Sequence, residues 1–173
     1  MQSVSVTVGA AGASKWIPVD HTKANFGVSM AGTISSGATL TYKVQHSLDN
    51  PFNRQPVSIS RTTTTATLTL ADHGLAVGDS VTVSGAGAPL DGYYAVASVV
   101  DANSITYTVD NSGVTASEAG ATAVLMRALD HSSMTGKTAN SDGNYAFPVK
   151  AVRVNVTAYT GGKVTLSVVQ GRV

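Results

Sequence analysis

The stretch RTTTTATLTLADHGLAVGDSVTVSG, from Arg61 to Gly85, decides the class of fold that the sequence predicts. Residues 66–71 and 80–84 alternate apolar or small side chains with Thr and Ser, and a period of two is typical of a β-strand with one buried face. The sequences DHG (residues 72–74) and GD (residues 78–79) lie between them and favour tight turns. The stretch therefore predicts a strand, a turn-rich link and a second strand.

The same alternation recurs along most of the chain, and no long segment has apolar residues at helical spacing. Alternating runs bounded by Gly, Asn, Asp and Ser predict an all-β protein, either a β-sandwich or a β-barrel. The predicted strands are residues 3–8, 15–19, 26–31, 38–47, 66–71, 80–84, 93–100, 104–109, 121–127, 151–158 and 163–170. A tight turn is predicted at Asp142-Gly143-Asn144, and Gly161-Gly162 is predicted to join the last two strands into a hairpin.

Low charge and the absence of cysteine argue against several kinds of partner and site. Of the 173 residues, 12% are charged and the formal net charge is +1, whereas about 25% are charged in typical soluble domains. No basic patch is present that would attract nucleic acid or an anionic membrane surface. Neither a disulfide nor a thiolate metal site is possible without cysteine. No leader segment is recognisable, and no apolar run approaches the roughly 18 residues of a membrane helix. We therefore expect neither a nucleic-acid nor a membrane partner.

The composition changes in the middle of the chain. Residues 58–127 are rich in Thr, Ala, Val and Gly, whereas the flanks contain Trp16 and all three Phe residues. We interpret residues 58–127 as a small β-barrel domain inserted into a loop of a larger domain. That larger domain is predicted to be a β-sandwich of jelly-roll type, formed by residues 1–57 and 128–173. Such an insertion requires that the two ends of the insert lie close together.

His73 is the first candidate for catalysis, because it lies between Asp72 and Gly74 with a second carboxylate at Asp79. A histidine base needs a nucleophile and an orienting group, and the G-x-S-x-G elbow of hydrolases is missing. Asp and Gly fit turns through local hydrogen bonds and backbone freedom. We therefore interpret this stretch as turn structure and predict no catalytic residue.

Four residues near the ends of the insert are candidates for a metal site. His46 with Asp49, and Asp130 with His131, come where the insert leaves and rejoins the flanks, and His and carboxylate are common metal ligands. Their spacing matches no helical H-E-x-x-H motif, and the chain has no calcium-loop or phosphate-loop pattern. A hydrogen-bonded pair of loops is the simpler interpretation. No metal-binding residue and no cofactor are predicted.

The flanks contain strings that resemble a known group of proteins. The N-terminal flank has WIP at residues 16–18 and YKVQH at 42–46. The C-terminal flank has DHSSMTGKTA at 130–139, NYAFPVKAVRVNVT at 144–157 and VTLSVVQG at 164–171. Together these strings resemble a family of small structural proteins of tailed-bacteriophage virions, over residues 15–52 and 128–171. The resemblance implies a β-sandwich with a fixed place in the particle.

The insert resembles a second kind of module. It contains HGLAVGDSVTVSG at residues 73–85, LDGYYAVASV at 90–99 and DANSITYTV at 101–109. This pattern is similar to that of small β-barrel modules of phage appendage proteins. The histidine and the aspartate recur in those modules without a known catalytic role, which implies a turn role for His73 and Asp79.

These observations predict a non-enzymatic structural protein of a bacteriophage virion. The first interpretation is a capsid decoration (cement) protein that binds the outside of the head and bridges subunits of the major capsid protein. The first alternative is a structural or adaptor protein of the tail, neck or baseplate, and the second is a module that binds a host-surface glycan. An enzyme such as a depolymerase is the least favoured, because no paired-carboxylate constellation is present.

Contact surfaces are therefore the candidate functional regions. The N-terminal strand is a candidate for addition to a neighbour's sheet, and aromatic side chains are candidate anchors in the core or in an oligomer interface. The candidate interface residues are Gln2, Val4, Val6, Val8, Trp16, Tyr145 and Phe147. The expected partners are the major capsid protein, other virion proteins and further copies of the chain, with a trimer as the predicted homo-oligomer.

Overall fold

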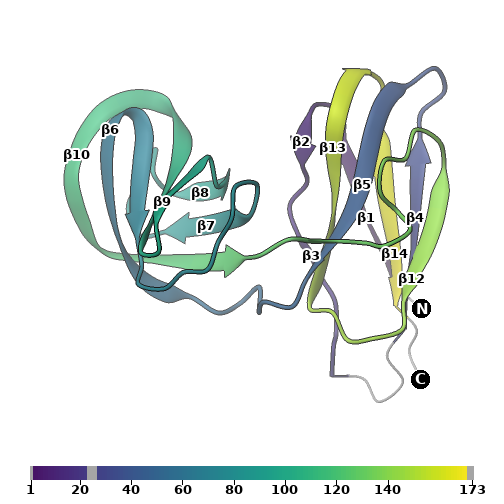
Figure 1. Ribbon diagram of the computed structural model, residues 1–173, viewed down its shortest axis with the longest axis horizontal. Coiled ribbons are helices and arrows are strands. Elements are labelled where there is room, and N and C mark those ends of the chain that lie inside the picture. Colours follow the sequence, from purple (N-terminus) through teal and green to yellow (C-terminus); the bar gives the residue numbers. More distant parts are fainter. Residues whose placement is uncertain (1, 23–26, 171–173) are drawn as a thin grey trace. The chain divides into compact units, whose positions relative to one another are not determined.

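A computed structural model describes residues 2–22 and 27–170, and no helix occurs in this part of the chain (Figure 1). The prediction of an all-β fold is confirmed. The chain divides into two compact units: the first comprises residues 1–48 and 129–173, and the second comprises residues 49–128. The second unit begins before residue 58 because the long strand β6 (Gln55–Thr69) starts there, and Gln55 and Pro56 already pair with β10 (Ser104–Met126).

The first unit is a β-sandwich of two antiparallel sheets (Figure 1). One sheet has the order β1-β14-β4-β12, and its strands are β1 (Gln2–Val8), β14 (Val164–Gln170), β4 (Val28–Ile34) and β12 (Ser141–Tyr145). The other sheet has the order β11-β5-β13-β2, with β3 also paired to β13; its strands are β11 (Leu129–Asp130), β5 (Thr39–Ser47), β13 (Ala151–Gly161), β2 (Gly12–Ala13) and β3 (Ile17–Pro18).

The connectivity of this sandwich follows one rule. The short strands β2 and β3 both pair with β13, so they act as one interrupted strand. Consecutive strands then lie in opposite sheets, except for β5 and β11, which pair with each other. This alternation over two four-stranded sheets is the strand order of a jelly roll. The second unit is inserted between β5 and β11, within one sheet.

The core of the first unit lies between the two sheets. Alternate residues of β5, β13 and β14 point inward and are buried, as the period of two predicts. Tyr42 on β5 crosses this core, because its fully buried ring reaches β4 and its hydroxyl donates to the carbonyl oxygen of Gly32 at 3.2 Å. The same hydroxyl lies 3.1 Å from the carbonyl oxygen of Ala139.

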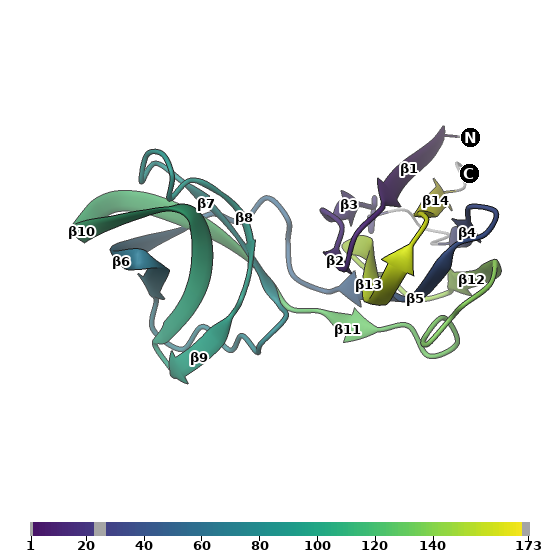
Figure 2. The same cartoon turned by 90° about the horizontal axis from the view of Figure 1, so that it is seen from above.

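The second unit is a strongly curved sheet around its own core (Figure 2). Its strand order is β6-β10-β7-β8, with β9 also paired to β10; the shorter strands are β7 (Ser80–Ser84), β8 (Gly92–Ala95) and β9 (Ser98–Asp101). β10 runs antiparallel to β6 with three register shifts, which is how β-bulges bend a long strand. One shift lies between Thr108 and Gly113, opposite Thr63, whose φ of 57° is unusual for a β-branched residue.

Several sequence predictions are wrong in detail. The predicted strands 104–109 and 121–127 are not separate: apart from Arg127 they belong to the single strand β10, whereas residues 93–100 divide between β8 and β9. The predicted strand 26–31 corresponds to β4, and Phe26 itself lies outside the described residues. β11 and β12 were not predicted, because two-residue strands and polar strands carry little alternation.

Both predicted turns also need correction. Asp142-Gly143-Asn144 is not a turn but the middle of β12, paired with β4. Gly143 is required there by close packing, since a Cβ would lie 2.7 Å from the sulfur of Met134. Gly161 is the last residue of β13 and Gly162 follows it, but β13 and β14 lie in different sheets, so they form no hairpin. Gly162 has a φ of +94° at this change of sheet, a conformation that favours glycine.

Candidate functional site

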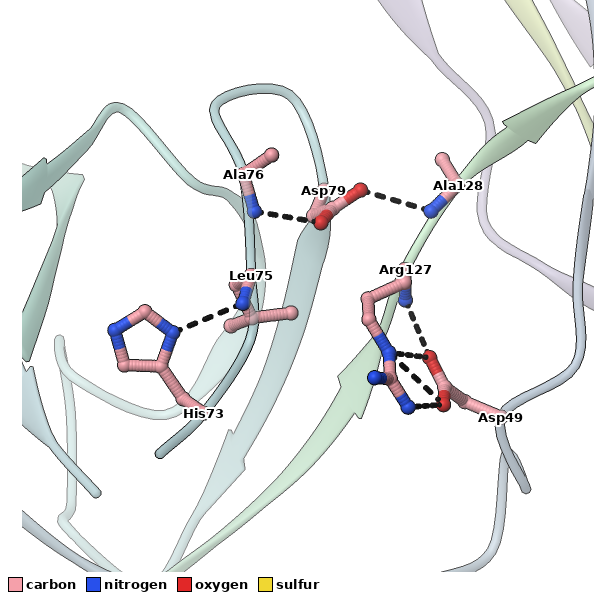
Figure 3. Close-up of polar contacts among 7 residues, drawn as sticks. All are labelled: Asp49, His73, Leu75, Ala76, Asp79, Arg127 and Ala128. Carbon is pink, nitrogen blue, oxygen red and sulfur yellow. Dashed lines mark hydrogen bonds and ion pairs between the residues drawn. The ribbon is translucent and has the colours of Figure 1, made fainter. Parts of the chain in front are cut away.

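His73 is buried in the second unit, and both of its ring nitrogens bind the backbone. The Leu75 N–H donates to Nδ1 at 3.0 Å, and Nε2 lies 3.0 Å from the carbonyl oxygen of Asp101 (the first contact is drawn in Figure 3). Because Nδ1 accepts a hydrogen bond, the ring proton is on Nε2, which donates to Asp101. Neither nitrogen is left to take a proton from a substrate, and the ring fastens the turn to the last residue of β9.

Asp79 plays a similar role a few residues later. It is 6% exposed, and its carboxylate accepts hydrogen bonds from two main-chain N–H groups, those of Ala76 and Ala128, each at 2.8 Å (Figure 3). Ala128 is the last residue of the second unit. The carboxylate therefore connects the turn before β7 with the exit of the chain from the unit.

A second contact fastens the two ends of the same unit. The carboxylate of Asp49, its first residue, accepts hydrogen bonds from the main-chain N–H of Arg127 at 2.6 Å and from Nε at 3.1 Å, and it also pairs with Nη2 (Figure 3). A bidentate Arg–carboxylate contact has a fixed geometry as well as charge attraction. The two ends of the second unit are therefore held side by side, as an insertion into a loop requires.

A small polar cavity lies beside this contact within the second unit. Its volume is about 140 Å³, and the residues that line it include Asp49, Asn50, Asn53, Gln55, His73 and Arg127. The carboxylate and the imidazole already have backbone or guanidinium partners. The cavity therefore offers amide groups and a guanidinium for a polar molecule rather than an acid–base pair for catalysis.

In the first unit, four side chains form an aromatic cluster: His46, His131, Tyr145 and Phe147. The ring of Tyr145 packs edge-on against His46 at 4.8 Å and against His131 at 4.7 Å between ring centroids. His46 Nδ1 lies 3.0 Å from the Tyr145 hydroxyl in the buried interior. Tyr145 is 2% exposed and Phe147 is 51% exposed, so only Phe147 presents a surface.

Burial controls the ionisation of this cluster. It lowers the pKa of His46, and the nearby His131 lowers it further, while Asp130 opposes both effects. Burial also raises the pKa of the Tyr145 hydroxyl. At neutral pH the contact therefore joins a neutral imidazole to a protonated phenol, which is a packing arrangement rather than an activated base.

The residues weighed as metal ligands have other partners. Asp130 accepts hydrogen bonds from Lys43 at 2.9 Å and from Gln45 at 2.8 Å. His131 Nδ1 lies 3.2 Å from the main-chain nitrogen of Ser133, and its Nε2 lies 3.2 Å from the carbonyl oxygen of Asn144. Among the side chains that the structure describes, which exclude those of residues 116–119, no three of His, Asp or Glu are placed together to hold a metal ion.

Sequence reasoning missed a buried polar row on the sheet that contains β5 and β13. Arg153 is 1% exposed, and its Nε donates to Oε1 of Gln45 at 2.9 Å. The Nε2 of the same Gln45 amide donates to the carboxylate of Asp130 at 2.8 Å. The half-buried ring of Trp16 lies over the guanidinium, with 4.5 Å from Cζ to the ring centroid. The signal in the sequence was a charged residue inside the apolar run VRVNV. Burial raises the pKa of Asp130, but hydrogen bonds from Gln45 and Lys43 and the charges of Lys43 and Arg153 outweigh it and lower the pKa.

The N-terminal strand is part of the sandwich. All seven residues of β1 pair with β14, from Gln2 opposite Gln170 to Val8 opposite Val164. Val6 and Val8 pack against the core, whereas Val4 is 45% exposed. The side chain of Gln2 lies outside the described part. Of the candidate interface residues with described side chains, Val4 and Phe147 are exposed, Tyr145 belongs to the core, and Trp16 covers Arg153.

Comparisons with known proteins identify no family. No family model matches the sequence, and no curated protein matches it. Among solved structures, the chain is similar to the phage phi92 endosialidase, with 23% sequence identity and a TM-score of 0.31. The similarity covers 66% of this chain and 14% of that chain. The structure contains, in its described part, no helix that is long and apolar enough to cross a membrane.

Proposed function

We propose that this chain is a non-enzymatic structural protein of a tailed-bacteriophage virion, and that it decorates the outside of the capsid. The proposal rests on one observation. The buried carboxylate and imidazoles, which could be mistaken for catalytic groups, form hydrogen bonds to the main chain instead. Asp79, His73 and His131 each contact main-chain groups on two different segments. Polar groups used in this way maintain a rigid scaffold.

The scaffold fits a protein that occupies a fixed position in a large assembly. Few surface charges need to be desolvated when such a sandwich is buried against a neighbour, because only 12% of the residues are charged. In the proposed arrangement the first unit binds the major capsid protein and bridges adjacent subunits. Many copies on one shell would then compensate for weak individual contacts.

Copy number in purified virions tests this function. Quantitative mass spectrometry should be calibrated against two internal standards, the major capsid protein and the major tail protein of the same particles. A fixed simple ratio to the capsid protein supports decoration. A ratio of a few copies per tail favours the alternative of a tail, neck or baseplate component, and absence from washed particles refutes a virion role.

A second candidate function is binding of a host-surface glycan by the second unit. It is favoured by the polar cavity of about 140 Å³ and by Phe52, which belongs to the same unit and is 75% exposed. Amide groups and an exposed aromatic ring are the kinds of group that recognise sugars. Binding to an array of bacterial surface glycans that is lost in both Asn53→Ala and Phe52→Ala, but kept in Val77→Ala, would support it.

A further inference from the structure

The two sheets of the first unit have four edges, and three of them carry features that hinder pairing with another chain. The edge formed by β2 and β3 is split into two-residue pieces and contains Pro18. The edge strand β11 has two residues, including the charged Asp130, and residues 131–137 continue along the same side of β5. The edge strand β12 contains the exposed Asp142. Short strands, proline and charges are the usual protection of a sheet edge.

The fourth edge, β1, has none of these features. It is seven residues long, QSVSVTV, with no charge, no proline and no shift in its register with β14. Its other side pairs with no strand of the described chain. A long, uncharged edge with open N–H and C=O groups is a template for pairing with another strand.

The two faces of β1 differ in character. Val4, Val6 and Val8 lie on the face that packs toward the core. Ser5 and Thr7 lie on the opposite face, where their hydroxyls meet those of Ser167 at 3.0 Å and Thr165 at 2.8 Å. A strand added at this edge must therefore present apolar residues on one face and small polar residues on the other.

We propose that β1 pairs antiparallel with β1 of a second copy about a two-fold axis. With the axis at Ser5, Val4 of each copy lies opposite Val6 of the other, and Ser3 lies opposite Thr7. Valine then lies opposite valine and hydroxyl side chains lie opposite hydroxyl side chains, apart from the outermost pair, Gln2 and Val8, and no charged residue lies opposite another. The four-stranded sheet of each copy becomes half of a continuous eight-stranded sheet. A contact of this kind is isologous and uses the same surface on both copies.

This contact is independent of whether the protein is located on the head or the tail. It does differ from the trimer that the sequence suggested, because a two-fold edge contact closes on itself as a dimer. A larger assembly would require a further surface. The oligomeric state in solution therefore tests the proposal without any other virion component.

The substitution Val4→Lys tests pairing through β1 most directly. It places a charge on the core-facing side of the edge, which is a device that natural edge strands use against pairing. The matched control is Val77→Lys, the same change at a loop valine that is 68% exposed. Sedimentation equilibrium should give twice the chain mass of 17.6 kDa for the unaltered protein at high concentration. The same mass is expected for V77K, and the single-chain mass for V4K.

Hydrogen exchange locates the contact without any substitution. On dilution of the unaltered protein from dimer to monomer, amide protection should fall in residues 2–8 and remain unchanged in β12. A protein that stays at the single-chain mass at all accessible concentrations overturns the proposal. So does a dimer whose exchange in residues 2–8 is insensitive to dilution, because such a dimer uses another surface. If V4K retains the fluorescence of folded Trp16 and still dimerises, the proposal also fails.

Discussion

Replacement of Gly32 by alanine should destabilise the sandwich, because Gly32 is the point where the two sheets approach through Tyr42. A Cβ at Gly32 would lie 2.5 Å from the Tyr42 hydroxyl oxygen and 2.7 to 2.8 Å from two ring carbons. Real Cβ atoms do not tolerate such distances, and the Tyr42 ring is fully buried. The ring must therefore move within a packed core.

The size of the effect follows from two contributions. Forcing a methyl group into a well-packed core costs about 1–3 kcal/mol. Displacement of the Tyr42 hydroxyl weakens its contacts with the carbonyl oxygens of Gly32 and Ala139, and a typical hydrogen bond contributes about 1 kcal/mol. We expect Gly32→Ala to lower the free energy of unfolding of the first unit by about 2–4 kcal/mol.

Urea denaturation followed by tryptophan fluorescence measures this effect in the correct unit, because Trp16 is the sole tryptophan of the chain and lies in the first unit. The control is Gly161→Ala, where a Cβ meets nothing within 4 Å. In combination with Tyr42→Phe, which removes the nearest oxygen, Gly32→Ala should cost about 1 kcal/mol less than the sum of the single changes. A loss under about 0.5 kcal/mol for Gly32→Ala, or strict additivity, would refute the proposed contact.

Three further predictions concern the polar contacts and the division into units. Asp79→Ala removes two charge-assisted hydrogen bonds and should destabilise the second unit by about 3 kcal/mol, seen as faster amide exchange at Ala76 and Ala128. Because the folded-state pKa of His46 is below its ordinary value of 6.5, the unfolded chain binds more protons below that pH. The first unit should lose stability as the pH falls through this region, and a His46→Gln variant whose urea midpoint depends equally on pH would contradict the assignment. Deletion of residues 49–128 with a short Gly-Ser link should leave a sandwich that unfolds cooperatively by Trp16 fluorescence, and loss of that transition would show that the first unit depends on the second.

Most strands were predictable because the alternation of apolar and polar residues reflects a local property, the burial of one face of the strand. In β5, Leu40, Tyr42 and Val44 are buried and alternate with half-exposed or polar residues, so the strand is evident from its sequence. β12 was missed because its sequence SDGNY gives no such alternation, although it pairs with β4 over five residues. Within it, Gly143 lies close to the side chains of Met134 and His131, and the sequence of the strand itself does not indicate these neighbours.

Sheet membership was not predictable from the runs alone. VRVNV and KVTLSVV look like the arms of one hairpin, yet β13 and β14 lie in opposite sheets. A glycine pair that reverses the chain within a sheet and one that carries it across the sandwich give the same local sequence. Only the partners distinguish them: β13 pairs with β5, whereas β14 pairs with β1 and β4.

The histidines show where local prediction ends. The sequence Asp-His occurs at 20–21, 72–73 and 130–131. At the second and third of these, His Nδ1 lies within hydrogen-bonding distance of the main-chain nitrogen two residues later, at Leu75 and at Ser133. This contact is local, so turn chemistry predicts it from the sequence. The other ring nitrogen meets a carbonyl oxygen far along the chain, at Asp101 in one case and Asn144 in the other. That second contact consumes the remaining nitrogen, and it depends on a fold that the two-residue motif does not encode. The hydrogen bond to the distant carbonyl oxygen therefore distinguishes a structural histidine from one that is free to react, and the local sequence does not predict that bond.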